Sequence, residues 1–292
     1  MPRFLTLIRF EMVKVLARKK AFLFLLALNV VPLLASIVAL LIYLKLKGWG
    51  LGGFEFSVLV EMVRGLFIAH MVVFAWISPF FLALVIGDSV SGEAGRGSLK
   101  ILLLTPVERW QVVVAKAVAV LVFLMLAVAL GGFFLQLDLW VARAMTESPA
   151  MRWDVKTAST ALVETTAALQ LFVLSFLSHL ALVGFFLVFA QFSESPIMMA
   201  FISLIVLMTM QVYVLMAPHL AHLDPRFGQV ADWCFTRHLS KLSSIETVQG
   251  ILDQRLSLWH PDVWQPLRDG LGWAAFFFAV AILLFRRRPI LN

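Results

Sequence analysis

Residues 21–44 read AFLFLLALNVVPLLASIVALLIYL, a stretch of 24 residues without one charged side chain. A helix needs about 20 apolar residues to cross the hydrocarbon core of a bilayer, so this stretch is long enough to span a membrane. The composition agrees, because 62% of the 292 residues are hydrophobic and only 14% are charged, whereas soluble domains carry about 25% charged residues. We therefore expect an integral membrane protein.

Further apolar stretches follow along the chain. They cover residues 66–86, 112–136, 167–192, 196–217 and 266–285. The last one, GLGWAAFFFAVAILLF at 270–285, is short and reaches full length only if its helix begins near Pro266. The predicted fold is an all-α polytopic membrane protein, with six transmembrane helices in one domain over residues 21–292.

Residues 1–20 precede the first span and predict a separate amphipathic helix. One sector of the helical wheel holds Phe4, Leu5, Ile8, Met12, Val15 and Leu16, and the basic Arg3, Lys14 and Arg18 lie mostly opposite. Phe10 and Val13 do not fit this division. We expect a helix in the membrane interface with its basic face toward anionic lipid. The alternative is a plain basic flank, and the length of the basic and apolar regions excludes a cleavable signal peptide.

Basic residues predict the orientation of the chain, because they concentrate on the cytoplasmic side. With six spans, one side carries 13 of the 24 Lys and Arg residues and 5 of the 17 acidic ones. Both termini and residues 87–110 belong to that side. We therefore expect a multi-pass protein of the cell inner (cytoplasmic) membrane with both termini in the cytoplasm. No soluble basic face interleaved with aromatics indicates nucleic-acid binding.

Two segments on the opposite side, 137–166 and 218–265, are longer than simple turns. In the second, Asp224-Pro225 is a typical helix start, and Ser243 or Ser244 can cap another helix. We expect short outer helices packed over the span exits before the last span. The stretch HPDVW at 260–264, with Trp259 and Trp264, predicts an interfacial anchor.

The polar stretch SGEAGRGSLKILLLTPVERW at 91–110 resembles a phosphate-binding loop at first sight. A Walker A loop needs lysine directly after its last glycine, yet Ser98 and Leu99 follow Gly97, and a membrane helix rather than a strand comes before it. No other Walker or kinase motif occurs, and the outer Asp, Glu and His residues have no catalytic or metal spacing. We expect no catalytic residue, no metal site and no enzyme activity in this chain. The apolar run Ile101 to Leu104 instead predicts a bent cytoplasmic helix that docks on a partner.

The longer stretch GDSVSGEAGRGSLKILLLTPVERWQVVVAK, residues 87–116, resembles the signature segment of ABC-2 type permeases, the membrane subunits of one class of ABC exporter. The matching positions are Asp88, Ser91-Gly92-Glu93, Gly97-Ser98-Leu99, Pro106, Arg109 and Lys116, and the departure is Ser98 where the family has Thr. Six spans, an amphipathic N-terminus and a long loop before the last span extend the resemblance to the whole chain.

The resemblance implies that residues 87–110 form a coupling helix in a cleft of a separate ATPase subunit, which would hold ATP and Mg. This chain would then need no cofactor. The implied contact residues are Asp88, Glu93, Gly97, Leu99, Leu102, Pro106 and Arg109, with Glu194 in a second contact, the turn QFSESP at 191–196. Glu93 and Arg109 would orient an exposed joint by ion pairs.

The function implied is that of an export permease working with a dimer of ATPase subunits, a second permease (identical or different) and membrane lipids. An alternative is mechanical coupling of ATP hydrolysis to a periplasmic or envelope partner without solute transport. Another is copper-enzyme maturation, which a branch of the family serves. Its sequence signal would be the soft ligands of the fifth span, although methionine is also a common apolar filler. The soft ligands are the methionines of the fifth span and two histidines that follow it: Met198, Met199, Met208, Met210, Met216, His219 and His222.

Polar residues at membrane depth are candidates for a transport pathway. The three we single out are Asn29, His179 and Gln211. The alternative for each is a hydrogen bond between helices, which polar residues in spans commonly make.

Overall fold

A computed structural model of the chain describes residues 2–19, 74–98, 107–146 and 155–287, together with seven isolated positions between 23 and 45. Over 134–146 and 155–164 only the backbone is described. Every regular element in these ranges is a helix, which confirms the all-α fold class.

Among the described residues, five helices are long and apolar enough to cross a membrane, the pattern of a multi-pass membrane protein. They are Phe74–Gly95, whose last turn is α4 (Ser91–Gly95), and α6 (Arg109–Thr146), α7 (Val155–Phe189), α8 (Pro196–Leu220) and α12 (Pro261–Arg287). The predicted span 21–44, apart from isolated positions, and the start of the second span lie outside the described residues, so the number six stays a prediction.

Three helix bounds differ from the sequence prediction. Helix α6 runs past residue 136 to Thr146, and α7 begins at Val155 rather than at 167, so much of the segment 137–166 continues the two spans. Helix α12 begins at Pro261, five residues before the predicted start at Pro266. Pro261 occupies the first helical position, where its missing N–H costs nothing. Pro266 lies in the second turn, where it removes one backbone hydrogen bond without ending the helix.

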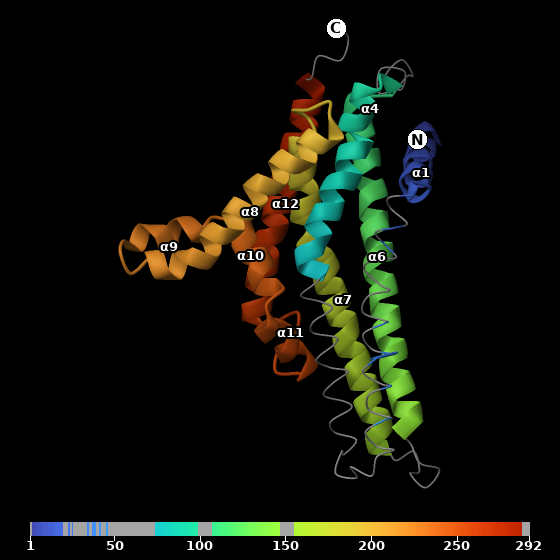
Figure 1. Ribbon diagram of the computed structural model, residues 1–292, viewed down its shortest axis with the longest axis vertical. Helices are drawn as coiled ribbons and strands as arrows, with labels where there is room; N and C mark the ends of the chain where they lie inside the picture. The colour runs from blue at the N-terminus through green and yellow to red at the C-terminus, as the bar shows by residue number, and fades with distance from the viewer. Residues whose placement is uncertain are drawn as a thin grey trace.

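The core of the bundle lies between helix Phe74–Gly95, α6, α7 and α12, which are side by side in Figure 1. Helix α1 (Pro2–Leu16) packs along α6 near the N-terminus of the latter. Gly184 permits the close approach of α7 and α12, because a Cβ there would lie 2.9 Å from the Cβ of Phe277. Helix α6 is apolar around its whole circumference, as expected of a span surrounded by protein and lipid.

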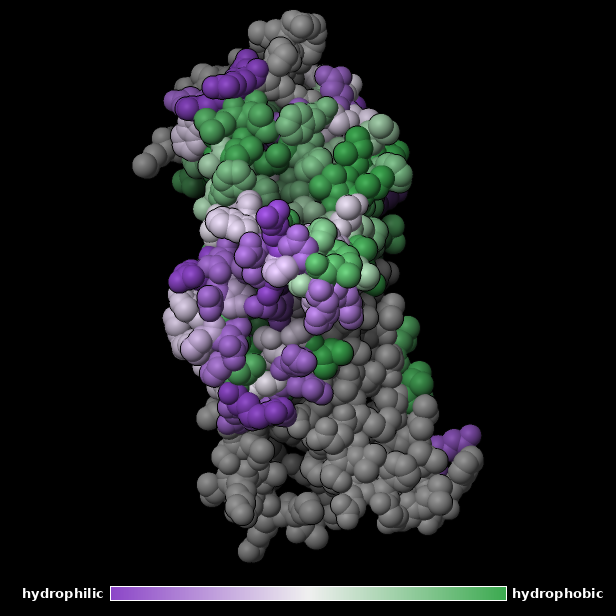
Figure 2. Space-filling model, turned by 90° about the vertical axis from the view of Figure 1, so that its left-hand side faces the viewer, coloured by the Kyte–Doolittle hydropathy of each residue, from purple (hydrophilic) through white to green (hydrophobic). Residues whose placement is uncertain are grey.

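Helix α8 leans away from the bundle and forms an arm with the helices that follow it (Figure 1). Its apolar side chains remain largely exposed, with Ile197 at 75% and Phe201 at 62%. On the face that carries this arm, Figure 2 shows an apolar band above a polar band. The apolar band is the part of this face suited to contact with lipid acyl chains.

Three short helices connect α8 to α12, of which the sequence predicted the first and the third within 218–265. They are α9 (Pro225–Asp232), α10 (Phe235–Leu242) and α11 (Ile245–Leu252). The predicted caps are confirmed, since the side chain of Asp224 accepts a hydrogen bond from the Arg226 N–H at 2.8 Å and Ser244 accepts one from the Thr247 N–H at 3.2 Å. Helices α10 and α11 share a second apolar core with α7 and α12.

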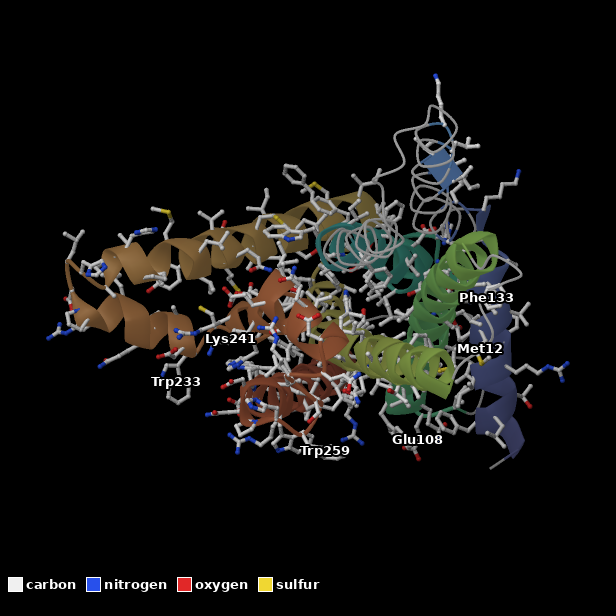
Figure 3. The ribbon with its side chains drawn as sticks, turned by 90° about the horizontal axis from the view of Figure 1, so that it is seen from below. Met12, Glu108, Phe133, Trp233, Lys241 and Trp259 are labelled. Carbon is white, nitrogen blue, oxygen red and sulfur yellow. The ribbon has the colours of Figure 1, made fainter. Side chains whose placement is uncertain are left out.

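The tryptophans of this region point outward. Trp233 and Trp259 lie at the edge of the molecule in Figure 3, with 78% and 77% of their surface exposed. The rings of Trp259 and Trp264 pack together with their centroids 5.3 Å apart. Their predicted place at the membrane surface stays a prediction.

Candidate functional site

Glu93 lies at the end of helix Phe74–Gly95, in α4, and is almost completely buried, with 3% of its surface exposed. Its carboxylate accepts charged contacts from two lysines, at 2.6 Å from the Lys14 Nζ and 2.6 Å from the Lys116 Nζ. An Arg18 guanidinium nitrogen lies 3.4 Å away. Glu93 is therefore surrounded by cations from α1, α6 and the residues just after α1.

Lys116 lies in the third turn of α6 and is 1% exposed. Its Nζ contacts a second carboxylate, that of Glu11 in α1, at 3.0 Å, and Glu11 is also 1% exposed. Lys14 completes the arrangement, because its Nζ lies 3.2 Å from Glu11. Glu11, Lys14, Glu93 and Lys116 thus form a closed cycle of alternating charges, which we call the charge ring.

The charge ring satisfies the condition under which ionised groups can be buried. An isolated buried charge costs several kcal/mol, and each ring member has two partners of opposite sign. Arg18 extends the ring toward Asp88, with 3.7 Å between the nearest nitrogen and oxygen. Glu11 and Lys14 are three residues apart on one face of α1, and Arg18 follows just after the end of this helix.

This arrangement corrects two sequence-based expectations. Lys14 and Arg18 do not face anionic lipid, because they pair with buried carboxylates. Glu93 is not part of an exposed joint, and it pairs with Lys14, Arg18 and Lys116 rather than with Arg109. The physical reason is the same for both: the apolar sector of α1 packs on α6 and brings its basic face against α4.

The apolar sector of α1 is accordingly turned toward protein. Met12 lies beside α6 in Figure 3, and Val15 is 1% exposed. Phe4 and Ile8 pack against the same core. The apolar residues that remain exposed include the two that did not fit the predicted pattern; they are Leu5, Phe10, Val13 and Leu16.

The turn at 191–196 lies directly against the segment that holds Glu93. The Ser91 hydroxyl donates to the Ala190 carbonyl at 3.2 Å. A Cβ on Gly95 would lie 2.6 Å from the Glu194 carbonyl oxygen, and one on Gly87 would lie 2.9 Å from the Pro196 carbonyl oxygen. The structure therefore brings the two predicted contact segments together, and glycine is required where they touch.

Beyond α4 the chain turns at Gly97, whose φ of 72° is in the left-handed region that glycine adopts freely. The Ser98 hydroxyl donates to the Glu93 carbonyl at 3.2 Å and closes this turn. Asp88 is half-buried, whereas Glu194 is exposed. Arg109, at the start of α6, donates to the Arg286 carbonyl of α12 at 3.2 Å. Leu99, Leu102 and Pro106 lie outside the described residues.

His179 is buried between α7 and helix Phe74–Gly95. One ring nitrogen lies 2.6 Å from the Ser78 hydroxyl and the other 2.6 Å from the Ser175 carbonyl. Since a carbonyl only accepts, Nδ1 carries the proton toward Ser175 and Nε2 accepts from Ser78. A small cavity of about 20 Å³ adjoins His179. It has room for a single water molecule. This geometry fits a hydrogen bond between helices better than a solute pathway.

Of the other two polar candidates, the structure describes Gln211 alone. Gln211 in α8 accepts a hydrogen bond from the Ser240 hydroxyl of α10 at 2.8 Å, and this bond joins α8 to α10. Asn29 lies outside the described residues.

The methionines of α8 do not converge on one point. Met198 is 53% exposed and Met216 is 47% exposed, whereas Met199 is buried. In the described part of the chain, no three His, Cys, Asp or Glu side chains lie close enough together to hold a metal ion. The arrangement gives the copper interpretation no support.

Sequence reasoning missed Glu11 and the inward role of Lys14. Glu11 is the one acidic residue among the first twenty, three positions before Lys14, and a lone acid on a basic helix is a signal for a specific cation. Lys116 was noted only as part of a motif, although a lysine four residues into an apolar span requires a buried partner.

Comparison with known proteins adds no assignment. No protein-family model matches the chain, and no curated protein matches it.

Proposed function

We propose that this chain is the permease subunit of an ABC exporter of the ABC-2 type, in which a separate ATPase subunit drives rearrangement of the spans. The observation that carries the proposal is the anchoring of residues 88–98. This segment emerges from an apolar helix, is fixed from inside by the charge ring, and abuts the turn at 191–196. A segment anchored in this way can transmit a displacement caused by a cytoplasmic partner to α1, α6, α7 and α8.

The polarity of the segment supports a partner on its outer surface. Its inward groups, Ser91 and Glu93, are occupied by intramolecular contacts. Ser98 remains exposed, as does Glu194 on the neighbouring turn. The apolar run 101–104 follows at once in the sequence. These are the surfaces we assign to the ATPase, which would carry the ATP and Mg that this chain has no motif to bind.

Site-directed photo-crosslinking in native membranes tests the proposal. A photoreactive residue replaces Ser98 in one variant and Ser257, in the outer segment, in a matched control. We expect Ser98 to crosslink to a protein that has Walker A and Walker B motifs, and Ser257 not to do so. Recovery of no such protein at Ser98, from a chain that is folded and in the membrane, would contradict the proposal.

Two substitutions separate docking from folding. Glu194→Lys and Leu102→Asp should release the ATPase while the purified chain keeps its thermal stability. Glu194 is exposed, and an exposed surface change is worth within about 0.5 kcal/mol. Glu93→Lys is not a suitable docking variant, since it places a fourth cation beside Lys14, Arg18 and Lys116. If both docking variants assemble and stimulate ATP hydrolysis as the wild type does, this surface is not the contact.

A second candidate function is mechanical coupling to an extracytoplasmic partner. Helices α6 and α7 have 38 and 35 residues, or about 57 and 52 Å at 1.5 Å per residue, against about 30 Å of hydrocarbon. The excess favours an extension beyond the bilayer. A partner protein that copurifies through this extension and stimulates ATP hydrolysis, where no solute does, would favour this function over export.

A further inference from the structure

We propose that Lys116 and Glu11 are positioning residues that join α1 to residues 91–98, so that the two move as one body when the ATPase acts. The inference rests on the proposed function and adds a component to it. The N-terminal helix becomes part of the moving element rather than a passive membrane anchor.

The topology of the charge ring carries the argument. Its contacts run Glu11 to Lys14 (3.2 Å), Lys14 to Glu93 (2.6 Å), Glu93 to Lys116 (2.6 Å) and Lys116 to Glu11 (3.0 Å). Two members belong to α1, one to α4 and one to α6. Any displacement of Glu93 alone would break two ion pairs at once, and each leaves a charge buried without its full complement of partners.

The burial of the charge ring makes the connection between α1 and α4 rigid. Glu11, Glu93 and Lys116 are each at most 3% exposed, so water cannot readily replace a lost contact. The lysine and glutamate side chains also have little freedom to follow a moving partner in a packed interior. The low-cost response to a push on α4 is therefore motion of α1 together with it, and the first turns of α6 must follow, because Lys116 pairs with both Glu11 and Glu93.

A purely structural role predicts something different. Buried ion pairs are weak stabilisers, and neutral replacement of a complete pair is often tolerated. The double substitution Glu11→Gln with Lys116→Met removes one negative and one positive charge and leaves Lys14 paired with Glu93. If the ring only held the fold together, restored stability in this variant would also restore function.

The experiment uses the permease assembled with the ATPase identified by crosslinking. Spin labels at Ala17 and Arg96, both exposed, report the distance between α1 and the segment, and a second pair at Ala17 and Leu169 reports α1 against α7. Cys234 is replaced by serine. Distances are measured without nucleotide and after vanadate trapping with ATP, and permease-stimulated ATP hydrolysis is measured in parallel.

In the wild type we expect the Ala17–Arg96 distance to stay constant while the Ala17–Leu169 distance changes. In the Glu11→Gln/Lys116→Met variant, we expect the thermal midpoint to stay within a few degrees of wild type. Its Ala17–Arg96 distance should change on trapping, and stimulation should fall to the rate of the ATPase alone. The control is Asp232→Asn/Arg237→Met, which removes an ion pair from the outer region and should behave as wild type.

A wild-type Ala17–Arg96 distance that changes on trapping would overturn the inference, as would a neutralised variant that is stable and fully coupled. If the neutralised variant fails to fold, Lys116→Met with Glu93→Gln replaces it, since it leaves Glu11 paired with Lys14. Failure of the wild-type chain to assemble with any ATPase would instead overturn the proposed function itself.

Discussion

Replacing Gly95 by alanine should destabilise the protein through one close contact. Gly95 is the last residue of α4 and lies against the turn at 191–196. A Cβ at this position would lie 2.6 Å from the Glu194 carbonyl oxygen. The φ of Gly95 is not in the left-handed region, so alanine meets no backbone penalty there and the effect of the change comes from the contact.

The expected loss of stability depends on which atom the new Cβ contacts, the Glu194 carbonyl oxygen. A backbone oxygen cannot swing aside as a flexible side chain can, so α4 or the turn must shift by several tenths of an ångström. Overpacking of this kind costs about 1–3 kcal/mol, and alanine returns about 0.5–1 kcal/mol through its lower backbone entropy in the unfolded chain. We expect a net loss of about 1–2 kcal/mol in the free energy of unfolding.

Reversible unfolding in mixed detergent micelles measures this loss, and Gly272→Ala in α12 is the matched control. A Cβ on Gly272 meets nothing within 4 Å, so this change should be neutral or stabilising by up to about 1 kcal/mol. If Gly95→Ala proves as stable as Gly272→Ala, α4 and the turn at 191–196 are not in the contact described.

Three further predictions address other parts of the molecule. The double-mutant cycle of Ser78→Ala and His179→Ala should give a coupling energy of about 0.6–1.7 kcal/mol in unfolding; a value near zero would exclude the hydrogen bond. Burial lowers the pKa of His238 below its ordinary 6.5, so the stability tied to this residue is fully present above pH 6.5 and is lost as the pH falls through the folded pKa. Unfolding measured against pH should show a shallower acid loss in His238→Gln, and identical profiles would contradict it. Single cysteines at Ser98 and Ser257 in a cysteine-free background should react with impermeant reagents from opposite sides of the membrane; labelling from one side would refute the six-span topology.

Local signals in the sequence were enough for much of the fold. Apolar runs longer than 20 residues identify α6, α7 and α8, because only a helix can satisfy its own backbone in lipid. Helix α9 begins where Asp224 precedes a proline and α11 begins at Ser244, because these caps act on the residues next to them. The bounds of α12 were less predictable, since two prolines five residues apart both suit a helix start and the outer packing of Val263 and Leu267 decides between them.

The candidate site was only partly predictable. The motif at 87–116 includes Glu93 and Lys116, which are two members of the charge ring. A motif does not say which way a side chain points, so it did not predict that they pair. Lys14 belongs to a basic N-terminal helix, for which anionic lipid is the ordinary partner. One of its two partners, Glu93, is 79 positions away in the sequence, and no local periodicity encodes a pairing of that range.

The burial of Glu93 changes the role that we assign to the start of the polar stretch 91–110. A charged residue at the end of a span can bind an outside partner or anchor the segment to its own protein, and composition does not distinguish the two. Here Glu93 and Ser91 do the anchoring, while Gly87 and Gly95 allow the segment to lie against the turn at 191–196. On the proposed function, docking then falls to residues beyond Gly97 and to Glu194. We expect substitutions at Glu93 to impair the fold and the motion together, and substitutions at 98–104 to impair assembly alone.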